Sequence, residues 1–60
     1  MKILYTVINI DNEEFSYHFK FDRAQQKALR LKEKFKNETF YVFHIPSQDI
    51  IWDTTGRSWL

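Results

Sequence analysis

The stretch that decides the fold is residues 14–37, where EFSYHFKF (14–21) is followed by DRAQQKALRLKEKFKN (22–37). In the first part every second residue is aromatic, which is the two-residue period of a strand with one buried face. In the second part the apolar residues recur at every third or fourth position, which is the period of a helix. The stretch therefore predicts an aromatic strand that leads directly into one helix.

The expected ends of this helix follow from its flanking polar residues. Asp22 should cap the first turn, because its carboxylate can accept the free amide hydrogens there. Asn37 can adopt the left-handed conformation that closes many helices, so the helix should span about residues 22–37. One narrow apolar stripe should pack on the sheet: Ala24, Ala28, Leu31 and Phe35. We expect the aromatic residues of the preceding strand to lie under it: Phe15, Tyr17, Phe19 and Phe21.

Two further segments, residues 2–10 and 39–45, are rich in β-branched and aromatic residues and are apolar on both alternating faces. This pattern is typical of strands that have a neighbour on either side. The turn-forming residues 11–13 connect the first segment to the aromatic strand as a hairpin. Placing both segments at the centre predicts the sheet order 2-1-3-4, for strands numbered along the chain.

A second hairpin is predicted near the C-terminus. Residues 54–56, Thr-Thr-Gly, fit a three-residue loop whose glycine takes the left-handed conformation. This loop would set Asp53 opposite Arg57, and Ile51 opposite Trp59. An opposite-charge pair beside the turn supports that register.

Residues 47–53 leave a second interpretation open, a short helix capped by Ser47. The adjacent β-branched residues Ile50 and Ile51 favour a strand instead. The predicted fold class is therefore α+β. It has two layers, an antiparallel sheet of four or five strands and one helix packed on one face, in the order strand-strand-helix-strand-strand, and it forms one compact domain over residues 1–60.

Composition explains how so short a chain can fold. Its 60 residues are 43% hydrophobic and 18% aromatic, with no cysteine, so a dense apolar core and not a disulfide must hold it. The formal charge of +1 gives no overall attraction to nucleic acid or to a membrane. With no run of 18 apolar residues and no signal-peptide pattern, we expect a soluble protein of the cytoplasm with no membrane partner.

The apolar residues exceed what one helix can cover, because the first and third strands are apolar on both faces. We therefore expect an uncovered apolar patch on the sheet, with Tyr41 and Phe43 as candidate partner contacts. Trp59 is a third candidate, since tryptophan is frequent in binding hot spots, whereas Trp52 should be structural. Two other interpretations of this sheet face remain open. Either the C-terminal segment folds back over it as a second core layer, or a second copy of the chain covers it in a homodimer.

Basic residues are concentrated in the predicted helix, which carries six of the nine cations. Four of them repeat the spacing of the apolar stripe and form a second stripe beside it: Arg23, Lys27, Arg30 and Lys34. Such a stripe can steer an acidic protein, follow a phosphate backbone or be a solvated helix face. The sequence pI of about 8.0 is low for a domain that binds duplex nucleic acid.

Catalytic chemistry is not expected. The two histidines, His18 and His44, lack the spacing of a zinc site, and no Gly-rich phosphate loop or nucleophile motif is present. We expect no metal and no cofactor. His18 should point to solvent, and His44 should be a structural residue on the face of the third strand that carries Phe40 and Val42.

These features predict a small non-enzymatic protein-binding module that captures or inhibits another macromolecule, with an acidic protein as the expected partner. Nucleic-acid binding by the basic stripe is the alternative. A small ribonuclease-like toxin that uses one of the histidines is the third hypothesis. The size and the Lys-, Asn-, Ile- and Phe-rich content suggest a phage or mobile-element accessory protein.

Overall fold

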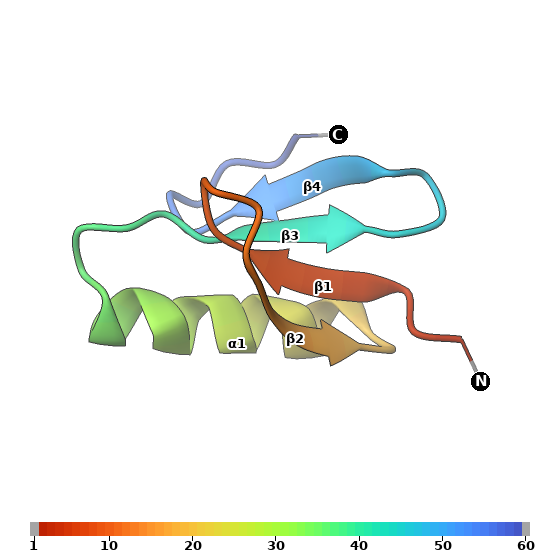
Figure 1. The fold of residues 1–60 in the computed structure, drawn as a ribbon, viewed down its shortest axis with the longest axis horizontal. Coiled ribbons are helices and arrows are strands. Elements are labelled where there is room, and N and C mark those ends of the chain that lie inside the picture. Colours follow the sequence, from red (N-terminus) through yellow and green to blue (C-terminus); the bar gives the residue numbers. More distant parts are fainter. Residues whose placement is uncertain (1, 60) are drawn as a thin grey trace.

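The computed structural model describes residues 2–59. Its elements are β1 (Tyr5–Ile8), β2 (Glu14–His18), α1 (Phe21–Lys34), β3 (Tyr41–His44) and β4 (Asp49–Asp53). All strand pairings are antiparallel, and the order across the sheet is β2-β1-β3-β4. Figure 1 shows the four strands side by side, with α1 running back along β2 after the chain reverses direction. The predicted fold class and strand order are both confirmed.

The core lies between α1 and the sheet. Its buried residues are Val7, Ala24, Ala28, Phe40 and Val42. Ala24 and Ala28 are fully buried, and their short side chains let the helix backbone approach the strands closely. Leu31 packs against this cluster, and Phe35, just beyond the helix, contacts the ring of Phe40 at a centroid distance of 6.2 Å. The apolar stripe of the helix therefore faces the sheet as predicted.

The start of the helix differs from the prediction. Lys20 and not Asp22 is the N-cap residue, and no side chain caps the first turn. Asp22 lies within that turn, where its carboxylate accepts a hydrogen bond of 3.0 Å from the amide of Arg23. An acidic side chain in the first turn still favours the positive end of the helix, so the electrostatic role is kept although the cap position is wrong.

The end of the helix also differs. α1 ends at Lys34, and left-handed backbone among the described residues occurs at Asn12, Gln48 and Gly56, so the predicted left-handed cap at Asn37 is wrong. The ammonium of Lys32 instead donates hydrogen bonds of 2.9 Å to the carbonyls of residues 36 and 38. A lysine side chain thus satisfies carbonyls that follow the helix.

The face of β2 that is turned toward the helix is the opposite of the one predicted. Val7, which is buried under α1, pairs with Ser16, and Tyr5 pairs with His18. Because paired residues of antiparallel strands share a face, Ser16 and His18 lie on the helix side. Tyr17 lies on the other side and is 52% exposed, so its predicted place under the helix is wrong.

A bulge is the physical reason for this error. The register between β1 and β2 shifts after Val7, which leaves Phe15 as an extra residue in β2. The Phe15 ring reaches Phe40 on the helix side, at a centroid distance of 5.3 Å, while Phe19 lies beyond the strand and is 47% exposed. One inserted residue exchanges the side chains of a strand that face inward with those that face outward. The two-residue period of the sequence does not show where such an insertion lies.

The predicted C-terminal hairpin is present in the predicted register. The amide of Asp53 donates to the carbonyl of Arg57 at 3.1 Å, and the amide of Trp59 donates to the carbonyl of Ile51 at 3.0 Å. Gly56 has a φ of 86°, as the loop requires. Residues 47–53 therefore contain a strand and not a helix, and the segment after the loop pairs with the outer edge of β4.

The Asp53 side chain fastens this segment to the sheet. Asp53 is 4% exposed, and its carboxylate accepts hydrogen bonds from the Trp59 indole at 2.9 Å, from the Thr55 amide at 2.8 Å and from the Thr55 hydroxyl. Burial raises the pKa of Asp53, but these hydrogen bonds outweigh it and lower the pKa overall. The Arg57 guanidinium lies 5.0 Å from the centroid of the Trp59 ring.

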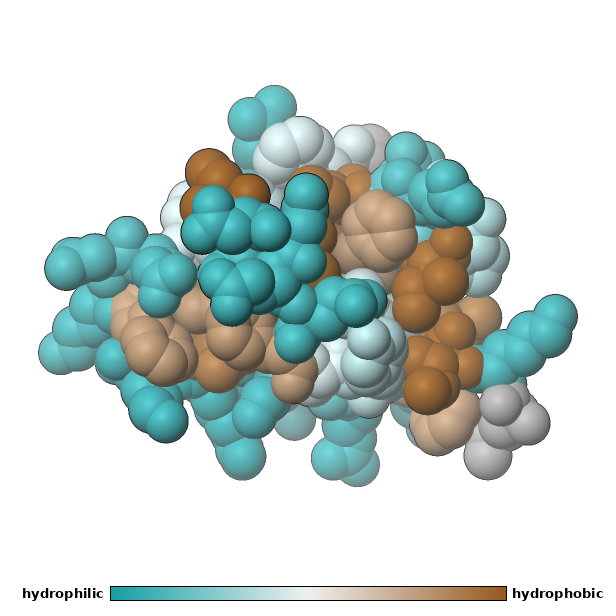
Figure 2. All heavy atoms as spheres, viewed as in Figure 1, coloured by the Kyte–Doolittle hydropathy of each residue, from teal (hydrophilic) through white to brown (hydrophobic). Residues whose placement is uncertain are grey.

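The sheet face opposite α1 is less open than the sequence predicted. Thr6 and Ile8 are buried there, and Tyr41 and Phe43 are half-buried. Trp59 reaches this face, where its ring contacts that of Tyr41 at a centroid distance of 6.3 Å. In the view of Figure 2 the hydrophobic side chains form separate patches, with hydrophilic side chains between them.

Candidate functional site

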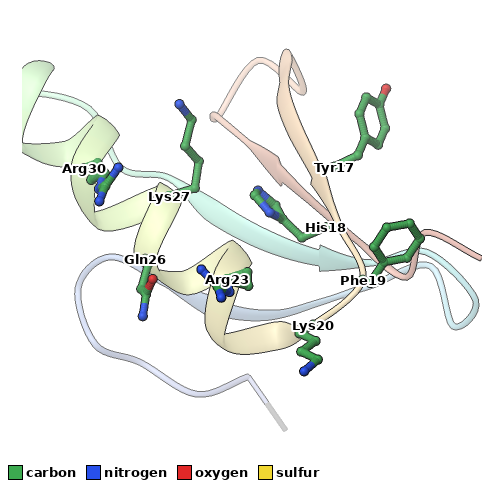
Figure 3. A pocket seen from close by; sticks show the side chains of 8 residues that line it. All are labelled: Tyr17, His18, Phe19, Lys20, Arg23, Gln26, Lys27 and Arg30. Atoms are coloured by element: carbon green, nitrogen blue, oxygen red, sulfur yellow. The ribbon is translucent and has the colours of Figure 1, made fainter.

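A groove of about 500 Å³ lies between β2 and α1. We call it the β2–α1 groove; its lining residues are Tyr17, His18, Phe19, Lys20, Arg23, Gln26, Lys27 and Arg30. Figure 3 shows the His18 imidazole between the strand and the helix, with the Tyr17 and Phe19 rings on the far side of the strand. Among the described residues that line it, four are cations and none is acidic. The groove is therefore a concave surface of positive potential on a chain whose net charge is only +1.

The helix period places the cations here. Arg23 and Lys27 each precede a buried alanine, Ala24 or Ala28, so they lie on the flank of α1 about 100° from its buried line. Arg30 continues the same flank at the 4-3 spacing. Two residues, 19 and 20, separate β2 from α1, and this short link keeps the strand beside the first turns of the helix. The basic flank consequently lies against the β2 side of the sheet.

His18 lies on the strand side of the groove. It is half-buried, and its Nε2 is 2.7 Å from the hydroxyl of Ser16. In Figure 3 the imidazole points from β2 toward α1, so the expectation that His18 faces solvent is wrong. Burial lowers the pKa of His18, and the positive charge of Lys27 lowers it further. The folded chain therefore favours the neutral imidazole, and bringing a carboxylate into the groove would favour its protonation.

Two exposed aromatic side chains, Tyr17 and Phe19, form the rim of the groove on the strand side. A hydrogen bond with the Glu14 side chain raises the pKa of Tyr17, with smaller contributions from burial and from the charge of Glu14. The phenol therefore stays protonated near neutral pH. The rim offers apolar contact area beside the charged interior.

The structure separates the residues that the sequence singled out into two groups. Arg23, Lys27 and Arg30 come together in the groove. Lys34 lies farther along the helix, with its ammonium 5.6 Å from the centroid of the Phe35 ring. The aromatic candidates lie elsewhere, because Tyr41 and Phe43 belong to the sheet face opposite α1 and Trp59 contacts Tyr41. A single binding site containing all of them is not formed.

Several groove residues were not predicted as site residues: Tyr17, Phe19, Lys20 and Gln26. His18 was considered only as a catalytic residue in the ribonuclease-like hypothesis. The signal that could have found them is the short link between strand and helix, which forces the last residues of β2 next to the first basic turns of α1. The missing information was which face of β2 meets the helix.

The groove runs beside an open edge of the sheet. β2 is the first strand in the order β2-β1-β3-β4, so in residues 2–59 its outer side pairs with no other strand. The opposite edge differs, because a bridge between Trp52 and Ser58 pairs β4 with the C-terminal segment. Backbone hydrogen-bonding groups and cationic side chains are thus available together at β2.

A smaller, mainly apolar hollow of about 370 Å³ is lined by Tyr5, Phe21, Ile51, Trp52 and Ser58. Within residues 2–59 no three His, Cys, Asp or Glu side chains come together as a metal site would require. None of the helical structure described is long and apolar enough to cross a bilayer.

Comparison with known proteins gives no relative. No protein-family model matches the chain, and no curated protein or solved structure matches it either. The functional proposal therefore rests on the residues of the β2–α1 groove.

Proposed function

We propose that this protein is a non-enzymatic binding module that captures an acidic segment of a partner protein in the β2–α1 groove. The observation that carries the proposal is the set of four cations, with no acid among the lining residues, beside an unpaired strand edge. Binding there would occlude the captured segment. This is how so small a module would inhibit its partner.

Electrostatic attraction would raise the association rate and the selectivity of binding more than the affinity. An exposed ion pair is worth about 0.2–1 kcal/mol, so four pairs supply only part of the free energy of a stable complex. Clustered cations do accelerate encounter with an acidic partner and reject basic ones. The remaining affinity must come from groups that the groove and its edge also present, the aromatic rim and the strand backbone.

The first test is the binding of a fluorescein-labelled oligoglutamate peptide, followed by anisotropy at low and high salt. In the groove variant Arg23→Glu/Lys27→Glu/Arg30→Glu we expect affinity to fall by about tenfold or more, because three attractive contacts become repulsive. Binding should also weaken as salt rises, since exposed charges more than about 10 Å apart are screened at 0.1 M.

A matched control changes the same number of charges elsewhere, in the variant Lys2→Glu/Lys34→Glu/Lys36→Glu. These three cations do not line the groove. We expect this variant to bind nearly as well as the natural chain. Equal losses in the two variants would contradict a defined site and leave only the overall charge as the cause.

A second candidate function is the binding of single-stranded nucleic acid. The observation that favours it is the pair of exposed aromatic residues, Tyr17 and Phe19, next to the cations, because bases stack on aromatic rings beside a cationic groove. An unstructured oligonucleotide measured in the same assay decides between the two. Tighter binding of the oligonucleotide than of the acidic peptide, abolished by Tyr17→Ala/Phe19→Ala, would favour nucleic acid.

A further inference from the structure

We infer that the acidic segment binds as an extended strand added to the outer edge of β2, with acidic side chains at every second position facing the basic flank of α1. This inference rests on the proposed function, and it specifies the conformation and the sequence pattern of the partner segment. Strand addition is a common mode of peptide recognition, in which backbone hydrogen bonds provide affinity and alternate side chains provide specificity.

The edge of β2 is suited to accept a strand. Natural edge strands are protected by short length, by bulges, by proline, by lysine or by inward-pointing charges. The five-residue β2 has a bulge, but the positions between Glu14 and Lys20 carry no proline, lysine or carboxylate, because they read Phe-Ser-Tyr-His-Phe. The bulge at Phe15 distorts the first part of the strand, which leaves residues 16–18 as the regular part of the edge.

The other edge of the sheet shows the same interaction satisfied within the chain. Residues 57–59 pair with β4 through backbone hydrogen bonds to Asp53 and Ile51. No segment of residues 2–59 does this for β2. A partner strand at β2 would continue the sheet in the same way, so the fold already contains the geometry that we propose.

The first two cations of the basic flank are spaced along the helix axis much like same-face side chains of a strand. Figure 1 shows β2 beside the N-terminal half of α1 and inclined to the helix axis. With a rise of about 1.5 Å per residue, Arg23 and Lys27 are about 6 Å apart along the helix axis, and Lys27 and Arg30 about 4.5 Å. Same-face side chains of a strand repeat every ~6.6 Å, which is close to the Arg23–Lys27 interval and about 2 Å longer than the Lys27–Arg30 interval. Three acids at positions i, i+2 and i+4 could therefore each approach one cation.

The other positions of the added strand would lie on the face that carries Tyr17. At the β2 edge, this face presents the exposed side chain of Tyr17. Aromatic and β-branched pairs across strands are favourable, so apolar β-branched residues fit these positions. The ligand class is thus an extended peptide in which acidic and apolar β-branched residues alternate.

The test compares two labelled peptides of identical composition in the anisotropy assay with the full chain. In one, Glu and Val alternate; in the other, the same residues form a Glu block and a Val block. Strand addition predicts that the alternating peptide binds about tenfold more tightly, because only it presents every acid to α1. The oligoglutamate peptide of the proposed function serves as the reference for charge alone.

A second measurement probes the backbone directly. Methylating an amide nitrogen removes one donor, and alternate amides of an added strand point toward β2 and toward solvent. Methylation of one alternating set should weaken binding by about tenfold or more, and methylation of the other set should leave it nearly unchanged. No variant of the protein is needed, so a folding defect cannot imitate the result.

The outcomes separate this inference from the proposed function. Tighter binding of the alternating peptide together with the alternate methylation pattern supports strand addition. Equal binding of both Glu-Val peptides, with loss in the groove variant, overturns strand addition and leaves acidic-segment capture standing. Binding of the oligonucleotide alone overturns both.

Discussion

The two edges of the sheet differ in what lies against them. At β4 the chain supplies its own cover, because the segment after Gly56 pairs with the strand and the buried Asp53 carboxylate holds Trp59 in place. At β2 the edge is unpaired in the described chain and the neighbouring helix presents cations. We assign a stabilising role to the β4 edge and propose binding at the β2 edge, and the two edges can be perturbed separately.

The largest effect is expected at the covered edge, from Asp53→Ala. The substitution leaves the Thr55 and Trp59 donors without their acceptor, and we expect the free energy of unfolding to fall by about 2–4 kcal/mol. A 60-residue domain has only about 3–9 kcal/mol in total, so this is a large fraction. Urea unfolding followed by tryptophan fluorescence measures it. The exposed Asp49→Ala is the control, and a loss no larger than that of the control would contradict the role of Asp53.

A smaller loss is expected from Trp59→Phe, which keeps an aromatic ring beside Tyr41 but removes the indole donor to Asp53. The free energy of unfolding should fall by about 1 kcal/mol, and peptide binding in the β2–α1 groove should be unchanged. Urea unfolding and the anisotropy assay give the two quantities. Loss of peptide binding with stability unchanged would instead make Trp59 a partner contact, as the sequence predicted.

The smallest expected effect is on the pH dependence of stability and of peptide binding at the β2 edge. The pKa of His18 is lowered in the folded chain, so its contribution to stability is complete above its ordinary pKa near 6.5 and declines as pH falls below that value. A carboxylate bound nearby would raise this pKa, so peptide affinity should increase a few-fold between about pH 7.5 and 6. In His18→Gln the increase should vanish. An unchanged pH profile in that variant would show that the peptide does not approach His18.

Local chemistry explains which parts of the fold the sequence could predict. The loop before Arg57 was predictable because a glycine at the left-handed position allows few hairpin registers. The central strands were predictable because both their faces are apolar, as neighbours on either side require. In both cases the information lies within a few consecutive residues.

The orientation of β2 could not be predicted, for a physical reason. The helix side of β2 depends on the pairing of Val7 with Ser16 and on the bulge at Phe15, which are contacts between separate strands. The same dependence on contacts between strands limited the prediction of the site. The spacing of Arg23, Lys27 and Arg30 revealed the basic flank, but their proximity to His18 required the strand register.

The most direct test of the central claim is chemical-shift mapping of the isotope-labelled chain with the alternating Glu-Val peptide. Capture at the open edge predicts amide shifts concentrated in residues 16–20 and on the basic flank of α1, together with slowed amide exchange in β2. Residues of β4 and the segment 57–59 should change little. Shifts centred on Tyr41, Phe43 and Trp59, with β2 unaffected, would contradict the claim and return the binding site to the sheet face opposite the helix.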